Sequence, residues 1–332
     1  MTDNNSYAIV FAGQGAQKPG MGKSLYEVSP AAREVFENAG KKIMYYCFEA
    51  GDEELKQTEV TQPAVYTMGM AAYAALRESL KIDKGGFPAP SGLAGYSLGE
   101  YAAFTAAGVI DSLKTGLSLV KERSLFMKAA GTNQDGSQRG AMAAGVGSRD
   151  AVVALVEKAR EDSVLEAVNF NSPGQTVVAG DMVAVKRFTT LAASDRSFGV
   201  KAIPLPVSGA FHSPIMRPAA EALASELENY TFGEPVIPVY LNSTGESFRG
   251  SGMDASANIR AIMVRQIQSP VYWQKTIEAM AAAGIGTIIE VGPGKTLTGL
   301  AKKIAPEITA LHIEDAESLA ETAERLRAGA KD

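Results

Sequence analysis

The sequence predicts an α/β protein in which helices and a mainly parallel sheet form a large domain, and a small domain of βαββαβ order is inserted into it. Two observations support this prediction. Short apolar segments alternate with amphipathic segments of helical length, which is typical of helices packed on a parallel sheet. Near the middle of the chain, the polar stretch "GTNQDGSQRG" (131–140) interrupts the alternation and has the composition of a linker.

The composition fits a globular protein with a large core. The chain has 332 residues, 46% of them hydrophobic, and its formal net charge of −5 argues against general binding to nucleic acid. No apolar run reaches the roughly 18 residues of a membrane span, and the N-terminus lacks a signal-peptide pattern. We therefore expect a cytoplasmic protein with no membrane partner. The single cysteine, Cys47, cannot form an intrachain disulfide and lies in an apolar helical stretch that indicates a core residue.

The N-terminal third predicts the first strands and helices of the large domain. The apolar run "YAIVF" (Tyr7 to Phe11) is a strand that enters a glycine turn. In "SPAAREVFENAG", Ser29 is the N-cap, Pro30 is the first helical residue and Gly40 follows the helix. The helix "TQPAVYTMGMAAYAALRESL" precedes a weak strand, "GLAGYS", and two further helices, "LGEYAAFTAAG" and "SLKTGLSLVKERSLFMKAA".

The segment after the linker predicts the inserted domain. "GAMAAGVG" is a strand, "SRDAVVALVEKAR" a helix, "VLEAVNFNSPGQTVVAG" two strands with a turn, "DMVAVKRFTTLAAS" a helix and "VKAIPLPV" a strand. This is the order of ferredoxin-like domains. We place the insertion at 133–206, so that 1–132 and 207–332 form the large domain.

The large domain then resumes. We expect a helix over 218–230 and a strand over 238–244. Two helices follow, "SANIRAIMVRQIQ" and "VYWQKTIEAMAAAG", and then two strands, one in "TIIEVGPG" and one in "ITALHIEDAES".

One serine stands between two glycines at the junction of a predicted strand and helix. In "LAGYSLGEYAAF", Gly95, Ser97 and Gly99 form a G-x-S-x-G pattern, which in this position is typical of a nucleophile elbow. The glycines let strand and helix approach each other, and the helix N-terminus offers free N–H groups to an oxyanion. The alternative is a glycine turn in which Ser97 only caps the helix.

A serine nucleophile needs a general base, and the chain has only two histidines. His312 lies in the predicted terminal strand, where a surface or edge histidine is the simpler interpretation. His212 lies in "VSGAFHSPIM", a loop after the last strand of the insertion, and loops on a rigid scaffold often carry catalytic residues. His212 is therefore the better candidate.

Two further features bear on the chemistry. The loop "FAGQGAQKPGMG" matches neither the dinucleotide-binding nor the P-loop pattern, so its backbone is a candidate for a second oxyanion donor. Arg123 lies in a predicted helix, where a solvated face is the usual interpretation. If it is buried beside Ser97, it can hold a substrate carboxylate in a bidentate pair. No cluster of residues has metal-ligand spacing, so we expect no metal.

Taken together, these motifs resemble the family of malonyl-CoA:acyl carrier protein transacylases and the acyltransferases of polyketide synthases. The resemblance spans nearly the whole chain and keeps the order of the family's motifs. They are "GQGAQ" (13–17), "GYSLGEY" (95–101), "RSLFM" (123–127), "NFNSPGQTVVAG" (169–180), "GAFHSP" (209–214) and "EVGPGKTLTGL" (290–300). The resemblance implies a hydrolase-like large domain with a ferredoxin-like insertion.

The resemblance also implies roles for individual residues. Ser97 carries the acyl group as an ester, and His212 is its base and then the acid for the leaving group. The backbone N–H groups of Gln14 and Leu98 form the oxyanion hole, and Arg123 binds the malonyl carboxylate.

Other residues are assigned to substrate binding or orientation. Gln266 helps to orient the site, and backbone carbonyls near Asn242 or Gln266 orient the histidine, since the family has no acidic third member. Tyr96 stands where the family usually has histidine, so hydrogen bonding in the acyl pocket can differ. Phe211 matches a position that accompanies malonyl preference, because phenylalanine crowds an α-methyl branch.

The function implied is ping-pong transfer of malonyl from CoA through Ser97 to the phosphopantetheine thiol of acyl carrier protein, in fatty acid biosynthesis. Malonyl-CoA is the substrate, no cofactor is expected, and we expect a monomer. Acyl carrier protein is acidic, so we expect a local basic patch, for which the candidates are Lys18, Lys23, Lys302 and Lys303. The alternative is that these are scattered surface lysines with no common role. The alternatives are a discrete acyltransferase of a polyketide pathway, a serine thioesterase or esterase, and a non-catalytic scaffold that binds carrier protein.

Overall fold

The computed structural model describes residues 6–250, 252 and 254–329, and these residues form two sheets. The larger sheet has the strand order β10-β9-β1-β2-β7-β8 and is parallel except for β8, which pairs antiparallel with β7. The predicted mainly parallel sheet is thus confirmed. Its strands are β1 (Tyr7–Phe11), β2 (Gly92–Gly95), β7 (Val239–Tyr240), β8 (Ser247–Phe248), β9 (Thr287–Val291) and β10 (Thr309–Ile313).

Helices cover both faces of this sheet. Along β1, Ile9 and Phe11 pack into a core with α5, α6 and α14, whereas Ala8 and Val10 pack with α12 and α13 on the opposite face. This two-residue alternation is the geometry of a strand buried on both sides. The helices of this domain are α1 (Lys23–Val28), α2 (Pro30–Ala39), α3 (Lys41–Phe48), α4 (Asp52–Leu55), α5 (Thr58–Leu80), α6 (Gly99–Ala106), α7 (Leu113–Ala130), α10 (Arg217–Leu227), α11 (Ala255–Ile267), α12 (Trp273–Ala282), α13 (Thr296–Ile304) and α14 (Ala316–Gly329).

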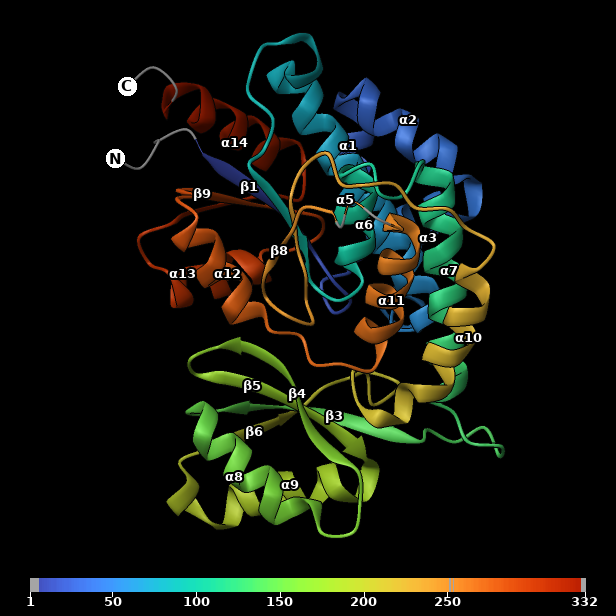
Figure 1. Ribbon diagram of the computed structural model, residues 1–332, viewed down its shortest axis with the longest axis vertical. Coiled ribbons are helices and arrows are strands. Elements are labelled where there is room, and N and C mark those ends of the chain that lie inside the picture. The colour runs from blue at the N-terminus through green and yellow to red at the C-terminus, as the bar shows by residue number, and fades with distance from the viewer. Residues whose placement is uncertain (1–5, 251, 253, 330–332) are drawn as a thin grey trace.

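The second sheet is antiparallel and has the order β4-β5-β3-β6. With its two helices it follows the predicted βαββαβ order. Figure 1 shows α8 and α9 on the face of this sheet that points away from the larger domain. The elements are β3 (Gly140–Val146), α8 (Arg149–Arg160), β4 (Leu165–Ser172), β5 (Gln175–Asp181), α9 (Met182–Ser194) and β6 (Lys201–Pro204). They lie within 133–206, and the domain boundaries themselves stay a prediction.

The structure corrects one predicted strand. The strand expected over 238–244 ends at Tyr240, because the chain turns back at Leu241, whose carbonyl accepts from the Gly245 amide at 2.7 Å. The turn places Asn242 beside the G-x-S-x-G segment instead of in the sheet. The predicted linker also has local structure, since Thr132 pairs with Gln138 and the Asn133 amide donates to Ser137 O.

Helices α1, α4, α13 and α14 were not predicted from sequence. Two of them, α1 and α4, have only six and four residues and no side-chain N-cap, so their sequences give little signal. In the described part of the chain, no helix is both long enough and apolar enough to cross a membrane.

A glycine in α7 sets how closely three helices of the large domain pack. A Cβ on Gly116 would lie 2.0 Å from Tyr66 Oη and 2.7 Å from Thr105 Oγ1, and these two hydroxyls are hydrogen-bonded at 2.9 Å. We expect Gly116→Ala to lower the free energy of unfolding by about 1–3 kcal/mol through overpacking. Gly299 is the matched control, because it is also helical and a Cβ there meets nothing within 4 Å. Gly299→Ala is expected to raise stability by up to about 1 kcal/mol. Denaturant unfolding of both variants tests the packing, and equal stabilities would contradict it.

Candidate active site

Ser97 occupies a sharp turn between β2 and α6. Its backbone is in the left-handed region, with φ +50°, which is unfavourable for a residue with a side chain. The flanking glycines are required by close approach: a Cβ on Gly95 would lie 1.9 Å from the carbonyl carbon of Gly99, and a Cβ on Gly99 would lie 2.3 Å from Phe11 O. The turn therefore has the strained geometry of a nucleophile elbow.

Two buried amide side chains hold this turn. The Ser97 N–H donates to Asn242 Oδ1 at 2.7 Å, and Asn242 Nδ2 donates to Gly95 O at 2.6 Å. Gln266 Nε2 donates to Ser97 O at 2.6 Å. Both amides are almost fully buried, so the Ser97 N–H and the carbonyl oxygens of Gly95 and Ser97 are hydrogen-bonded without water.

His212 contacts the serine hydroxyl directly. Its Nε2 lies 2.7 Å from Ser97 Oγ, and its Nδ1 lies 3.1 Å from the carbonyl oxygen of Gln266. Because a carbonyl only accepts, the Nδ1 proton donates to Gln266 O, and Nε2 is left as the acceptor for the serine hydroxyl. Burial, together with the positive charge of Arg123, lowers the pKa of His212 to about 4. The ring is neutral at pH 7, as a general base must be.

Arg123 is buried at the same point. It is 1% exposed, and its Nη2 donates to Ser97 Oγ and to Gln266 Oε1, both at 3.2 Å. Its Nη1 donates to Gln62 Oε1 at 2.8 Å, and the guanidinium carbon lies 5.4 Å from the centre of the Tyr101 ring. Among the described residues, no carboxylate lies within 4.0 Å of the guanidinium nitrogens, and Arg123 Nε has no hydrogen-bond partner.

Sequence reasoning missed Gln62. This residue is 0% exposed within α5, and besides accepting from Arg123 it donates from Nε2 to Gln14 Oε1 at 3.4 Å. The available signal was an amide inside an otherwise apolar helical face, because such a group needs buried partners.

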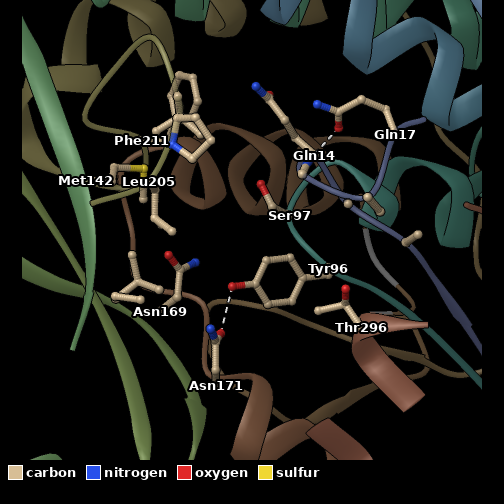
Figure 2. A pocket seen from close by; sticks show the side chains of 18 of the residues that line it. Gln14, Gln17, Tyr96, Ser97, Met142, Asn169, Asn171, Leu205, Phe211 and Thr296 are labelled. Atoms are coloured by element: carbon tan, nitrogen blue, oxygen red, sulfur yellow. Dashed lines mark hydrogen bonds between the residues drawn. The ribbon is translucent and has the colours of Figure 1, made fainter. Parts of the chain in front are cut away.

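Two backbone amides near Ser97 have no acceptor among the described residues: those of Leu98 and Gln14. The Ser97 amide is occupied by Asn242, and the Gly99 amide donates to Tyr96 O at 2.9 Å. Figure 2 shows Gln14 close to Ser97 at the edge of the cavity. Both N–H groups, one at a helix N-terminus and one in a glycine loop, are therefore free to donate to a bound group.

A cavity of about 410 Å³ opens over Ser97, His212 and Arg123. The insertion supplies much of its wall, with Met142, Asn169, Val177 and Leu205 among the lining residues (Figure 2). The cavity therefore lies between the two sheets.

Tyr96 and Phe211 both line this cavity. Tyr96 Oη donates to Asn171 Oδ1 at 2.7 Å (Figure 2). Asn171 Nδ2 in turn donates to Gln175 Oε1 at 3.1 Å. The residue before the serine is thus hydrogen-bonded to the insertion. Asn242 does not line the cavity and lies behind the elbow instead.

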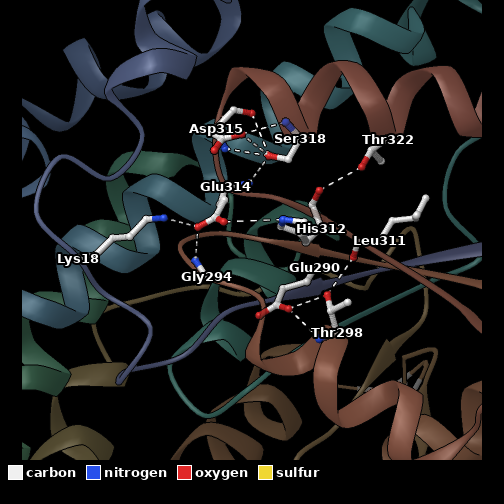
Figure 3. A network of polar contacts seen from close by, with 10 residues as sticks. All are labelled: Lys18, Glu290, Gly294, Thr298, Leu311, His312, Glu314, Asp315, Ser318 and Thr322. Carbon is white, nitrogen blue, oxygen red and sulfur yellow. Dashed lines mark hydrogen bonds and ion pairs between the residues drawn. The ribbon is translucent and has the colours of Figure 1, made fainter.

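His312 lies in a different part of the molecule. It is on β10, and its Nε2 is 3.7 Å from Glu314 Oε1 (Figure 3). Glu314 also pairs with Lys18, and Lys23 pairs with Glu49 at 3.6 Å. Two of the four lysines proposed for a basic patch are therefore already in ion pairs.

The described residues contain no group of three or more His, Cys, Asp and Glu side chains that could hold a metal ion. Cys47 is fully buried in α3, and burial raises the pKa of its thiol. It has the character of a core residue.

Comparison with known proteins gives consistent relatives. The acyl transferase domain family matches residues 8–323. Over 320 residues the chain is 41% identical to the malonyl CoA-acyl carrier protein transacylase of Escherichia coli (strain K12), covering 95% of this chain and 97% of that protein. The solved malonyl-CoA:acyl carrier protein transacylase of Xanthomonas oryzae pv. oryzae is similar with a TM-score of 0.86 at 38% identity, covering 98% of this chain and 99% of that one. The malonyl-transacylase PlMCAT, solved with the type II PKS acyl carrier protein AntF, has a TM-score of 0.86 at 34% identity, covering 96% and 99%.

The lowered pKa of His212 predicts how the reactivity of Ser97 depends on pH. Only the neutral ring accepts the serine proton. The rate of Ser97 labelling by a fluorophosphonate should therefore keep its pH 7 value when the pH is lowered past 6.5, and should fall only as the pH approaches 4. The check is the labelling rate by intact-protein mass spectrometry from pH 4 to pH 8, at each pH where circular dichroism shows folded protein.

Arg123→Ala is the control for this experiment. Removing the neighbouring cation should raise the pKa of His212 and move the loss of reactivity to higher pH. A wild-type rate already halved at pH 6.5 would contradict the lowered pKa.

Proposed function

The chain belongs to the acyl transferase domain family, as its motifs predict, and from this membership we propose that it is a malonyl-CoA:acyl carrier protein transacylase. The proposal assigns the catalytic roles to Ser97 and His212, the oxyanion hole to the amides of Gln14 and Leu98, and recognition of the acyl group to Arg123.

The buried Arg123 is the observation that carries the substrate assignment. Arg123 is 1% exposed, and no carboxylate of the described residues lies at ion-pair distance from it. Burying an unpaired cation costs free energy of folding. Burial also lowers the pKa of Arg123 from its usual value. A carboxylate on the acyl group would supply the missing counter-charge beside Ser97. Malonyl carries such a group and acetyl does not. The planar guanidinium suits bidentate binding of a carboxylate, whereas a plain esterase has no need of it.

The first half-reaction forms a malonyl-serine ester. Ser97 Oγ attacks the thioester carbonyl as its proton passes to His212 Nε2, 2.7 Å away. The N–H groups of Gln14 and Leu98 stabilise the oxyanion. The intermediate then collapses, the carbon–sulfur bond breaks, and His212 returns the proton to the departing CoA thiolate.

The second half-reaction repeats these steps in reverse. The phosphopantetheine thiol of acyl carrier protein gives its proton to His212, and the thiolate attacks the ester carbonyl. Ser97 leaves with the proton from His212, and malonyl-acyl carrier protein is released. The scheme is a double displacement with ping-pong kinetics and uses no cofactor.

Other residues have supporting roles in this proposal. The backbone carbonyl of Gln266 accepts from His212 Nδ1. Its side-chain amide accepts from Arg123 through Oε1 and donates to Ser97 O through Nε2. Asn242 supports the turn. Tyr96 and Phe211 shape the acyl pocket, where Phe211 limits room for an α-branch.

We place the enzyme in fatty acid biosynthesis, as a monomer in the cytoplasm with acyl carrier protein as its partner. The similarity to PlMCAT, solved with a type II PKS acyl carrier protein, favours a second candidate, a discrete acyltransferase of a polyketide pathway. Rates of malonyl transfer to acyl carrier proteins of the two pathways distinguish them.

Intact-protein mass after mixing with malonyl-CoA tests the proposed function. We expect a malonyl adduct on the wild type and none on Ser97→Ala. Arg123→Ala should lower the rate of malonyl labelling by about 100-fold or more, because the substrate carboxylate is left buried without its partner. Acetyl labelling should rise relative to malonyl labelling in this variant.

Arg123→Lys is the matched control, since it keeps a positive charge but loses the planar fork. Its malonyl labelling should fall between wild type and Arg123→Ala. Addition of holo-acyl carrier protein should then remove the adduct from the wild type. A wild type that hydrolyses malonyl-CoA without forming an adduct would overturn the proposal in favour of an esterase.

A further inference from the structure

We propose that Glu100 is a positioning residue for acyl transfer, which acts on Ser97 through Asn242. The inference rests on the proposed function, because it concerns the same nucleophile. Glu100 lies three residues after Ser97, in the first turn of α6, and is 1% exposed. Its Oε1 accepts a hydrogen bond from the backbone N–H of Asn242 at 2.6 Å.

Asn242 transmits this contact to the elbow. Its side chain bonds to both sides of the serine, accepting from the Ser97 amide at 2.7 Å and donating to Gly95 O at 2.6 Å. Asn242 is 0% exposed, so neither its backbone N–H nor its side-chain amide has water as a substitute partner. The position of the Asn242 backbone therefore fixes the position of the amide that holds Ser97 at φ +50°.

The need for Glu100 follows from the early end of β7. The strand ends at Tyr240, and the chain turns over 241–245, so the Asn242 N–H does not take part in the sheet. A buried N–H without an acceptor is strongly destabilising. Glu100 reaches it from the helix that begins behind Ser97, so the same helix start presents the nucleophile and anchors the group that holds it.

We expect the hydrogen bond that Glu100 accepts from the Asn242 N–H to matter more for positioning Ser97 than the negative charge of Glu100 does. Burial raises the pKa of Glu100 to about 7, while the Asn242 N–H, the positive charge of Arg123 and the side-chain amides of Gln266 and Asn242 oppose this shift. A carboxyl group keeps an acceptor oxygen whether or not it is protonated. Glu100 forms no ion pair with Arg123 within 4.0 Å, and among the described residues its carboxyl group is not a hydrogen-bond partner of Ser97 Oγ or His212.

A pair of substitutions separates these two properties. Glu100→Gln removes the charge but keeps an oxygen that can reach the Asn242 N–H. Glu100→Asp keeps the charge but draws the oxygen back by one carbon–carbon bond. We expect the glutamine variant to acylate Ser97 from malonyl-CoA within about threefold of wild type, and the aspartate variant to be slower by about 10- to 100-fold.

The KM for malonyl-CoA should stay within about threefold of the wild-type value in both variants, because Arg123 is untouched. Labelling of Ser97 by a fluorophosphonate, which does not need Arg123, should fall in the aspartate variant by the same factor as acylation. A glutamine variant as slow as the aspartate variant would overturn the proposal.

A double-mutant cycle tests the route through Asn242. If Glu100 acts only through Asn242, then Glu100→Asp should slow acylation little further when Asn242→Ala is already present. Effects that multiply would overturn the route.

The matched control for the cycle is Glu290, another buried glutamate, which accepts from the Thr298 amide at the start of α13 (Figure 3). It also accepts from the Leu297 amide. The effects of Glu290→Gln and Asn242→Ala should multiply, since these residues share no contact.

Thermal unfolding of every variant shows whether lost rate merely follows lost stability, which would also overturn a positioning role. The wild type serves as the reference throughout: if it forms no malonyl adduct, the proposed function fails, whereas a labelled wild type with an unaffected aspartate variant rejects only the role of Glu100.

Discussion

The left-handed backbone of Ser97 is the constraint on which the rest of the site depends. A residue with a side chain at φ +50° persists only where its surroundings hold it. Glycines on either side allow β2, α6 and β1 to approach within contact of the turn, and Asn242 bonds to both sides of it. The same contacts decide what the turn can do. Because Asn242 occupies the Ser97 amide, the Leu98 amide is the next one free to face an oxyanion.

The electrostatics of the site are consistent with a base that has no acidic partner. Arg123 next to Ser97 disfavours a charged His212, and burial acts in the same direction. A carboxylate behind the histidine would raise the pKa of the ring and would also compete with a substrate carboxylate for Arg123. The carbonyl of Gln266 orients the ring through Nδ1 and adds no charge. The role proposed for Arg123 in binding an acidic acyl group is therefore compatible with a neutral group that orients the histidine.

The sequence could predict what local pattern determines. The strand Tyr7–Phe11, the helix capped by Ser29 and the βαββαβ order follow from periodicity and cap residues, and Ser97 and His212 follow from a motif and from the scarcity of histidine. Sequence could not show the contacts of Asn242, Gln62 and Glu100. Asn242 meets Ser97 across 145 residues, and it does so only because β7 ends at Tyr240, four residues before the end of the predicted strand. Buried amides are placed by tertiary structure, so their partners cannot be found by local spacing.

The insertion supplies part of the wall of the cavity over Ser97. Its β4 strand bonds to the segment before α12, where the Phe170 N–H donates to Val271 O at 2.9 Å and the Val271 N–H donates to Val168 O at 2.8 Å. Tyr96 joins the same strand through Asn171 and is covalently next to Ser97. The apolar side chains of Met142, Val177 and Leu205, which belong to the insertion, line the same cavity as Ser97. An ester on Ser97 would be lost to water in an open cleft, and a transferase needs that ester to last until a thiol arrives. In the proposed function, the cavity wall that the second sheet supplies would limit the access of water to an ester on Ser97.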